Sequence, residues 1–149
     1  MSEDAIQAAL QQVERFPARA SAWLLLGRSF FEARRWPAAV EASRQAVRLD
    51  PASAGGWTLY GLSLRHCRQL EEGRSALRRA AELTPDDAVC WGNLASAHES
   101  LGELEEAESA AARAVALAPD SAAWHAVLGT TRRALGKLDG AIAANDRAQ

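Results

Sequence analysis

The chain has 149 residues, of which 48% are hydrophobic and 24% charged, and its formal net charge at pH 7 is −2. This is the composition of a folded soluble protein with enough residues for one well-buried domain. The weak negative charge offers no overall attraction to nucleic acid or to an anionic membrane, and the longest apolar stretches, such as residues 22–26, are too short to span a bilayer.

The cysteine content and the amino terminus favour a cytoplasmic location. Cys67 and Cys90 are too few for a disulfide framework, which favours a reducing compartment. The first residues include the acids Glu3 and Asp4 and no basic segment followed by an apolar run, which argues against a secretory signal. Charge is segregated along the chain: residues 18–53 carry six Arg and three acids (net +3), and residues 88–121 carry one Arg and six acids (net −5). We interpret these runs as solvated helix faces.

The first predicted pair of helices lies in residues 20–53. Its apolar residues recur at helical spacing, first at Trp23, Leu26, Phe30 and Ala33, and then on a second inner face at Ala39, Val40, Ser43, Ala46 and Val47. The same pairing recurs in residues 54–87 and 88–121 and begins again in residues 122–149. Strands are not expected, because Ala and Leu dominate and β-branched alternation is scarce.

A 34-residue period underlies these pairs. It is kept by prolines, by small residues and by tryptophans: Pro17, Pro51, Pro85, Pro119; Gly27, Gly61, Ala95, Gly129; Ala39, Gly73, Ala107, Ala141; Ala46, Ala80, Ala114, Ala148; Trp23, Trp57, Trp91. A fixed period of this length is typical of stacked supersecondary units, none of which buries its apolar face alone. The sequence therefore predicts an all-α solenoid of helix–turn–helix repeats.

The residues between the helices predict how each helix begins and ends. Each proline ends the preceding helix, and an N-cap acceptor follows it at Ser53, Asp87 and Ser121. Gly102 and Gly136 are placed to supply left-handed C-caps. Arg34 and Arg68 hold that place in the first two repeats, where the turn must close differently or under strain. We expect the mid-helix glycines to mark close approach of the paired helix backbone, and the tryptophans to pack in the core.

These residues resemble the tetratricopeptide repeat, whose pattern begins Trp-x-x-Leu-Gly and ends in Pro. The matching sets are Trp23-Leu26-Gly27-Phe30 with Ala39, Ala46 and Pro51; Trp57-Tyr60-Gly61-Leu64 with Gly73, Leu77, Ala80 and Pro85; Trp91-Leu94-Ala95-His98 with Ala107, Ala114 and Pro119; and Leu128-Gly129 with Ala141 and Ala148. The resemblance implies a right-handed superhelix over residues 1–149. Its expected parts are a second helix of an earlier copy in residues 2–17, complete repeats in 20–53, 54–87 and 88–121, and an incomplete repeat in 122–149.

The fourth repeat departs from the pattern. Trp124 comes one residue early and His125 stands where the tryptophan is due, so we expect its first helix to begin rotated or overwound. The sequence stops at Gln149 without the polar capping helix that usually finishes such arrays. We expect either a longer protein or a partner molecule that covers Ile142 and its neighbours.

The resemblance implies a concave groove lined by the first helix of each repeat. The residues expected to face this groove and bind a partner are Arg28, Phe31, Thr58, Leu62, Arg65, Asn93, Ser96, Glu99, Thr130 and Arg133. Leu25, Leu59 and Val127 would lie beside them, and the small residues Gly92 and Ala126 would leave room for an extended peptide or helix. Arginines would bind carboxylates and Asn93 a peptide backbone. The Lys and Asn residues of repeats that bind a peptide's C-terminal carboxylate are missing, which argues against a chaperone-tail receptor.

No constellation of residues predicts catalysis. His66, Cys67, Cys90, His98 and His125 match no zinc spacing, and a phosphate-binding glycine loop is absent. His98 is expected to pack where Phe30 and Leu64 pack. The basic group Arg74, Arg78 and Arg79 has acids within helical reach and no interleaved aromatics, which favours intrahelical pairing over nucleic-acid contact. We therefore expect neither enzymatic activity, nor a metal or other cofactor, nor binding to nucleic acid or membrane.

Three functions remain open. The first is a protein-interaction scaffold that binds a peptide or helix in the groove. The second is the amino-terminal regulatory or substrate-recruiting part of a larger enzyme, because such arrays are often joined to catalytic domains. The third is an assembly element that self-associates through its uncapped carboxy-terminal end.

Overall fold

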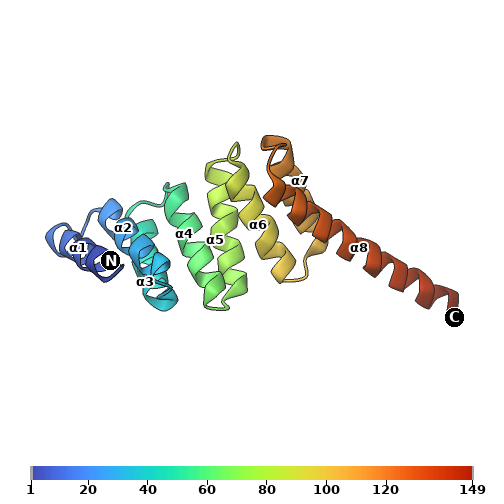
Figure 1. Ribbon diagram of the computed structural model, residues 1–149, viewed down its shortest axis with the longest axis horizontal. Coiled ribbons are helices and arrows are strands. Elements are labelled where there is room, and N and C mark those ends of the chain that lie inside the picture. Colours follow the sequence, from blue (N-terminus) through green and yellow to red (C-terminus); the bar gives the residue numbers. More distant parts are fainter. Residues whose placement is uncertain (1, 149) are drawn as a thin grey trace. The chain divides into compact units, whose positions relative to one another are not determined.

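The computed structural model describes the backbone of residues 2–148 and the side chains of residues 3–143. Within this part the chain forms helices and no strands (Figure 1). It divides into two compact units, which are residues 1–84 and residues 85–149. The all-α prediction is confirmed. None of the helices in the described part combines the length and apolar character that a membrane span requires.

Unit 1 contains five helices in its described residues: α1 (Ser2–Arg15), α2 (Ala20–Glu32), α3 (Trp36–Leu49), α4 (Ala54–His66) and α5 (Leu70–Leu83). Each helix packs against the next in the chain, and α2 also contacts α4. The turns within the α2–α3 and α4–α5 hairpins are short, so the paired helices run antiparallel. One core cluster joins α1 to α2 and α3 through Ile6, Ala9, Val13, Ala22, Leu26 and Ala42. A second joins α3 to α4 and α5 through Val40, Leu64 and Ala76.

Unit 2 contains α6 (Ala88–Ser100), α7 (Leu104–Leu117) and α8 (Ala122–Ala148). Here α6 pairs with α7, and α8 packs on both. The first helices α2, α4, α6 and α8 begin at Ala20, Ala54, Ala88 and Ala122, which keeps the 34-residue spacing of the sequence. The predicted N-caps are confirmed, because side-chain oxygens of Ser53, Asp87 and Ser121 accept backbone N–H groups of the first turn.

Each of the three hairpin turns in the described part of the chain contains one residue in the left-handed conformation. Arg34 (φ 60°), Arg68 (φ 64°) and Gly102 (φ 74°) have positive φ. Around Arg34, the N–H of Arg35 donates to Phe30 O (2.9 Å), and Arg34 N–H donates to Phe31 O, which is the Schellman arrangement. Gly102 adopts this conformation freely, whereas a side chain there costs about 1–2 kcal/mol. Of the two alternatives expected for these turns, a different closure or strain, the structure shows the same closure as at Gly102, with a left-handed arginine.

The tryptophans lock each first helix to the proline before it. The indole N–H groups of Trp23, Trp57 and Trp91 donate to the carbonyl oxygens of Pro17, Pro51 and Pro85, each at 2.8 Å. In α8 this partner is His125, whose Nε2 lies 2.7 Å from Pro119 O. The expectation that the fourth first helix begins rotated is therefore wrong, because histidine replaces tryptophan in the same contact and the helix keeps its register.

The two small-residue columns meet at Gly61 and Gly73 in the second repeat, whereas in the first repeat Gly27 lies against Ser43 and Ala42 of α3 instead of Ala39. A Cβ on Gly61 would lie 3.0 Å from Gly73 O, and one on Gly27 would lie 3.4 Å from Ser43 N, so paired backbones leave no room for a larger side chain. At Gly129 the prediction is wrong, because a Cβ there would meet nothing within 4 Å. The cause is the shape of α8.

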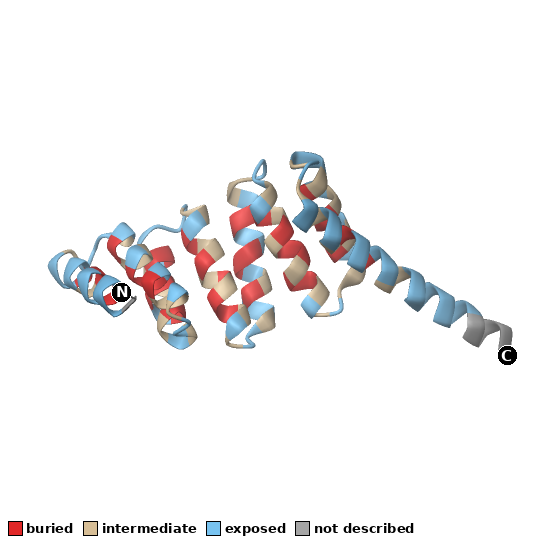
Figure 2. Ribbon diagram, in the orientation of Figure 1, coloured by how far each residue is buried: buried red, intermediate tan, exposed pale blue. Residues whose placement is uncertain are grey.

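Helix α8 continues where a turn was expected. It passes through Gly136 without a left-handed residue, so the predicted C-cap is absent and no second helix of the described chain packs back on Gly129. Figure 2 shows that its residues beyond the first turns are mostly exposed. The large apolar side chains Leu138 and Ile142 are 50% and 53% exposed. Ala148 of the small-residue columns lies outside the described side chains.

Candidate functional site

The predicted partner-binding residues of unit 1 lie on α2 and α4, which contact one another. Arg28 is exposed on α2, and its guanidinium lies 3.8 Å from the place that a Cβ on Gly55 of α4 would occupy. Leu25, one turn before Arg28, is 48% exposed. Helix α2 thus places Arg28 close to the first turn of α4 and carries an exposed leucine one turn before it.

The α4 residues of this set are partly covered. Thr58, Leu62 and Arg65 are all half-buried. The stem of Arg65 lies against α5, where its Cγ would be 2.9 Å from a Cβ on Gly73. Leu59, expected beside the groove, is instead buried, because its Cδ2 fills the space over Gly27. Leu59 therefore takes part in the packing between α2 and α4.

Phe31 takes part in a cluster of three aromatic rings. Its ring meets the edges of Trp36 (5.0 Å between centroids) and His66 (5.5 Å). Trp36 and His66 stack face to face at 3.9 Å with an interplanar angle of 8°. Trp36 was not among the predicted site residues, because it lies outside the repeating tryptophan column. The signal was present, since Leu70 and Leu104 hold the equivalent place in the next two repeats.

In unit 2 the predicted residues lie on α6 and α8. Asn93, Ser96 and Glu99 are half-buried on α6, and Thr130 and Arg133 are exposed on α8. Two of the hydroxyls are already engaged, because Ser96 donates to Gly92 O (3.2 Å) and Thr130 donates to Ala126 O (2.8 Å). Both groups keep their oxygen lone pairs for a ligand that donates a hydrogen bond.

Gly92 does not leave room for a ligand, contrary to the sequence-based expectation. A Cβ at this position would meet the ring of Trp124, which comes from α8 and covers the glycine. Trp124 stands one residue ahead of the tryptophan column, and this offset is what directs its ring to α6. The side chain that interrupts the repeat therefore joins α6 to α8.

His98 is buried on α6, as predicted for the place that Phe30 and Leu64 hold in the other repeats. Its Nδ1 lies 3.1 Å from Glu103 Oε1, at the start of α7. Burial and this contact give His98 a structural role in the hairpin.

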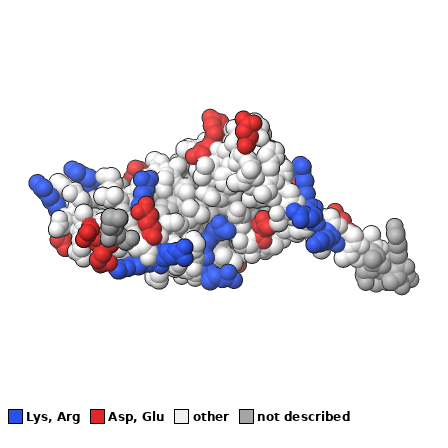
Figure 3. Space-filling view, viewed as in Figure 1, with Lys and Arg blue, Asp and Glu red and all other residues white. Residues whose placement is uncertain are grey.

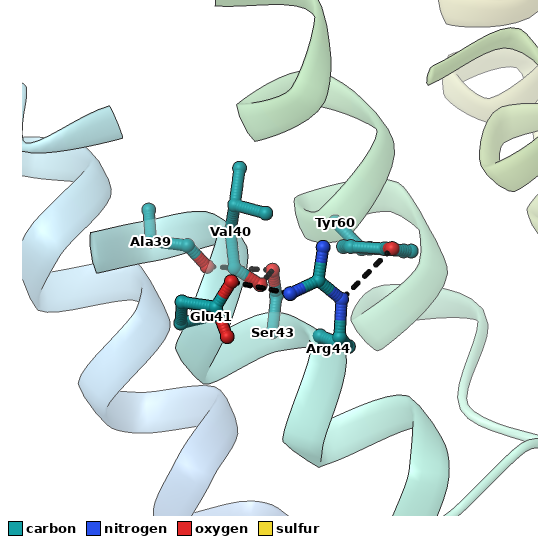
Figure 4. Close-up of polar contacts among 6 residues, drawn as sticks. All are labelled: Ala39, Val40, Glu41, Ser43, Arg44 and Tyr60. Atoms are coloured by element: carbon teal, nitrogen blue, oxygen red, sulfur yellow. Dashed lines mark hydrogen bonds and ion pairs between the residues drawn. The ribbon is translucent and has the colours of Figure 1, made fainter. Parts of the chain in front are cut away.

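A polar cluster that contains none of the predicted partner-binding residues links α3 to α4 (Figure 4). Arg44 Nε donates to the hydroxyl of Tyr60 (3.3 Å), and Arg44 also pairs with Glu41 one turn earlier. The hydrogen bonds to Tyr60 and then Glu41 raise the pKa of the Arg44 guanidinium above its usual value. Buried Ser43 donates to Ala39 O at 2.6 Å. The Arg44–Tyr60 hydrogen bond therefore joins successive repeats, whereas the Glu41 and Ser43 contacts lie within α3.

Within residues 3–143, His, Cys, Asp and Glu side chains do not gather in groups of three or more that would hold a metal ion. Arg79 and Glu82 form an ion pair within α5 at 3.8 Å, in agreement with the predicted intrahelical pairing. The sequence-predicted residues thus form two separate sets, one on α2 and α4 and the other on α6 and α8.

Solved structures with the same fold are numerous. MamA residues 41 to the end from Desulfovibrio magneticus RS-1 is 21% identical with a TM-score of 0.84, over 97% of this chain and 80% of that one. The first TPR of Spaghetti (RPAP3) is 19% identical with a TM-score of 0.76, over 79% and 94%. TTC0263, a TPR protein of Thermus thermophilus, is 20% identical with a TM-score of 0.75, over 87% and 72%. No curated protein matches the chain significantly.

The family comparison agrees with these structures. One tetratricopeptide repeat model matches residues 2–54 and 26–88, and a second matches residues 68–130. Together with the helix hairpins at 34-residue spacing, these matches establish an all-α helical-repeat solenoid. The chain belongs to the tetratricopeptide repeat family.

Proposed function

We propose that the chain is a non-catalytic scaffold that binds a peptide or helical segment of a partner protein along its first helices. In unit 1 the contacts are Arg28 and Phe31 of α2 with Thr58, Leu62 and Arg65 of α4. In unit 2 they are Asn93, Ser96 and Glu99 of α6 with Thr130 and Arg133 of α8. The family consists of protein-interaction repeats, and the similar first TPR of Spaghetti (RPAP3) has been solved with an HSP90 peptide, SRMEEVD.

The exposed leucine on α2 is the observation that carries this proposal. Leu25 is 48% exposed one turn from Arg28, whose guanidinium lies beside α4. Residues three positions apart on a helix share one face, so a partner meets an apolar contact and a cation together. This pair suits a segment with apolar and acidic side chains, because desolvated apolar anchors and charged hydrogen bonds supply most binding energy.

A charge placed at Leu25 should weaken partner capture without unfolding the protein. We expect Leu25→Glu to reduce the amount of captured partner at least about tenfold, since this is the effect of losing one central contact. The matched control is Leu49→Glu, which changes a leucine of similar exposure (41%) on the second helix α3. Quantitative mass spectrometry of proteins retained by the two immobilised variants checks this. Equal retention by both variants would contradict the proposal.

A second candidate function is self-association through α8. The observation that favours it is the exposure of Leu138 and Ile142 on a helix that has no second helix packed behind them in the described part of the chain. Sedimentation velocity over a concentration series should show dimers for the wild-type chain and monomers for the Leu138→Glu, Ile142→Glu double variant. A wild-type chain that stays monomeric at high concentration excludes this candidate.

A further inference from the structure

The ring cluster of Phe31, Trp36 and His66 joins two hairpin turns of unit 1. Phe31 is on the last turn of α2, Trp36 is the first residue of α3, and His66 is the last residue of α4. The stacking of Trp36 on His66 at 3.9 Å therefore holds the α2–α3 turn beside the α4–α5 turn. His66 is exposed and the other two rings are half-buried, so part of this aromatic surface faces solvent.

The two turns that the rings bring together each carry a strained arginine. Arg34 lies between Phe31 and Trp36, and Arg68 follows His66 by two positions; both are left-handed and exposed. The third hairpin of the chain fills this position with Gly102, which adopts the conformation without a steric penalty. A non-glycine residue kept in such a conformation points to a role for its side chain.

These two arginines keep their charge available. Among the described residues, neither Arg34 nor Arg68 forms an ion pair, whereas Arg35 pairs with Glu3 of α1 at 2.6 Å. The basic side chains that Figure 3 draws over unit 1 are all arginines, because the single lysine of the sequence is Lys137. Glu71 and Glu72 follow in the first turn of α5 and make no ion pair with Arg68 in the described part of the chain.

We propose that Arg34, Arg68, Trp36 and His66 form a binding surface for an acidic peptide segment of a partner protein, here called the turn-end surface. The two guanidinium groups bind carboxylates of the segment, and the solvent-exposed side of the stacked ring pair packs against an apolar side chain of the segment. Adjacent packed helices are about 8–10 Å apart, and residues three positions apart on a polyproline II segment lie about 9 Å apart on one face, so carboxylates at this spacing suit the two arginines. This inference rests on the proposed function, and it specifies the chemistry of the partner and adds contacts outside the α2–α4 set.

An acidic peptide fits this surface better than nucleic acid or a membrane does. The turn-end surface contributes two arginines, which is too few for the many phosphate contacts of a nucleic-acid site. The chain as a whole has a net charge of −2, which repels an extended polyanion or an anionic bilayer. A short segment with a few carboxylates meets the cations and avoids most of the acids elsewhere.

The test uses a variant that should fold better and bind worse. The Arg34→Gly, Arg68→Gly double variant places in both turns the residue found at Gly102. The probe is a fluorescein-labelled decapeptide with Glu residues at every third position and one central Leu, titrated by anisotropy at low salt. A control peptide carries Gln in place of each Glu. The Arg48→Gln, Arg78→Gln variant changes the net charge by the same amount on exposed helix positions.

We expect the double glycine variant to raise the urea midpoint of unfolding and to weaken binding of the acidic peptide at least tenfold. The Arg48→Gln, Arg78→Gln control should bind within twofold of wild type, and the Gln peptide should not bind. The proposal is overturned by absent wild-type binding, by unchanged binding in the glycine variant, or by equal loss in the control variant. Tighter binding of a labelled single-stranded oligonucleotide or of anionic vesicles also overturns it.

Two further variants separate this surface from the α2–α4 contacts. Trp36→Leu introduces the residue that Leu70 and Leu104 supply at the equivalent positions, so the hairpin should fold while peptide binding weakens. Leu49→Glu, which adds the same charge on α3 outside both sets of contacts, should leave binding of the acidic decapeptide unchanged. Loss with Leu25→Glu alone would place the peptide on α2 and α4, which overturns the turn-end surface and keeps the proposed function.

Discussion

Gly61→Ala is expected to lower the free energy of unfolding of unit 1 by about 2 kcal/mol, because the added methyl group overpacks the joint between α4 and α5. The new Cβ would lie 2.6 Å from Leu77 Cγ and 3.0 Å from Gly73 O, so both a buried side chain and the backbone of α5 must move. Leu77 is fully buried and cannot swing into solvent. Overpacking costs about 1–3 kcal/mol, and a 2.6 Å contact with a fully buried side chain places the cost near the upper end of this range. The better helix propensity of Ala returns about 1 kcal/mol, which leaves a net loss of about 2 kcal/mol.

Gly129→Ala is the matched control, because the same substitution is made in the same column of the repeat. Nothing lies within 4 Å of a Cβ at Gly129, so only the helix propensity changes and stability should rise by about 1 kcal/mol. Urea unfolding followed by far-UV circular dichroism compares the two variants with wild type. If Gly61→Ala proved as stable as Gly129→Ala, the close approach of α4 and α5 would be wrong.

Trp124→Ala is expected to destabilise unit 2 by about 2–3 kcal/mol, since it removes a large ring from a packed joint. The ring of Trp124 covers Gly92 and joins α8 to α6, and its removal leaves a space that the backbone at Gly92 has no side chain to fill. Substitutions of buried Trp by Ala cost about 3–5 kcal/mol, and a half-buried ring falls toward or below the lower end of this range. Thermal unfolding of the variant, with wild type alongside, measures the loss.

The partner residue supplies the second half of this test. Gly92→Ala alone should also destabilise unit 2, by about 1–3 kcal/mol, because its Cβ displaces the ring of Trp124. In the double variant the clash is gone, so its loss should not exceed that of Trp124→Ala alone. Residues in contact show such non-additivity, whereas additive losses would place Trp124 away from Gly92.

The features that depend on local spacing were predictable from the sequence. The starts of the first helices were predictable because proline lacks the backbone N–H that the preceding helix would need to continue. The side chain of Ser53 or Asp87 then accepts a hydrogen bond from the first turn of the next helix. The close approach at Gly61 was predictable for the same reason, because a glycine kept inside a helix needs a steric cause. These contacts lie within one repeat, so the residues that make them recur every 34 positions and can be recognised in the sequence.

The carboxy-terminal helix was not predictable in this way. The period continues through Gly129 and Ala141, but a hairpin forms only if burial of its second helix exceeds the cost of the turn. After Gly136 the described large apolar side chains are Leu138 and Ile142, and both stay exposed. The periodic columns therefore persist in sequence while α8 remains one continuous helix.

The candidate site was predictable in its columns and not in its contacts. The 34-residue period assigns Arg28 and Thr58 to first helices. It relates equivalent positions of different repeats and does not describe which side chains touch. Trp124 and Trp36 lie outside the tryptophan column, so their contacts with Gly92 and His66 depend on packing between helices that no spacing rule describes. In both cases the residue that breaks the column makes the contact.

The tryptophan-to-proline hydrogen bonds have a consequence for how the chain changes length. Each of these hydrogen bonds lies within one short segment, because its two residues are close in sequence. The pairs are Pro17 and Trp23, Pro51 and Trp57, Pro85 and Trp91, and Pro119 and His125. A cut after one proline, rejoined at the equivalent place in the next repeat, restores the same bond. Duplication or deletion of whole 34-residue repeats in the gene therefore preserves every one of these hydrogen bonds. An insertion between a proline and the ring that bonds to it, if it is not a whole repeat, breaks that hydrogen bond.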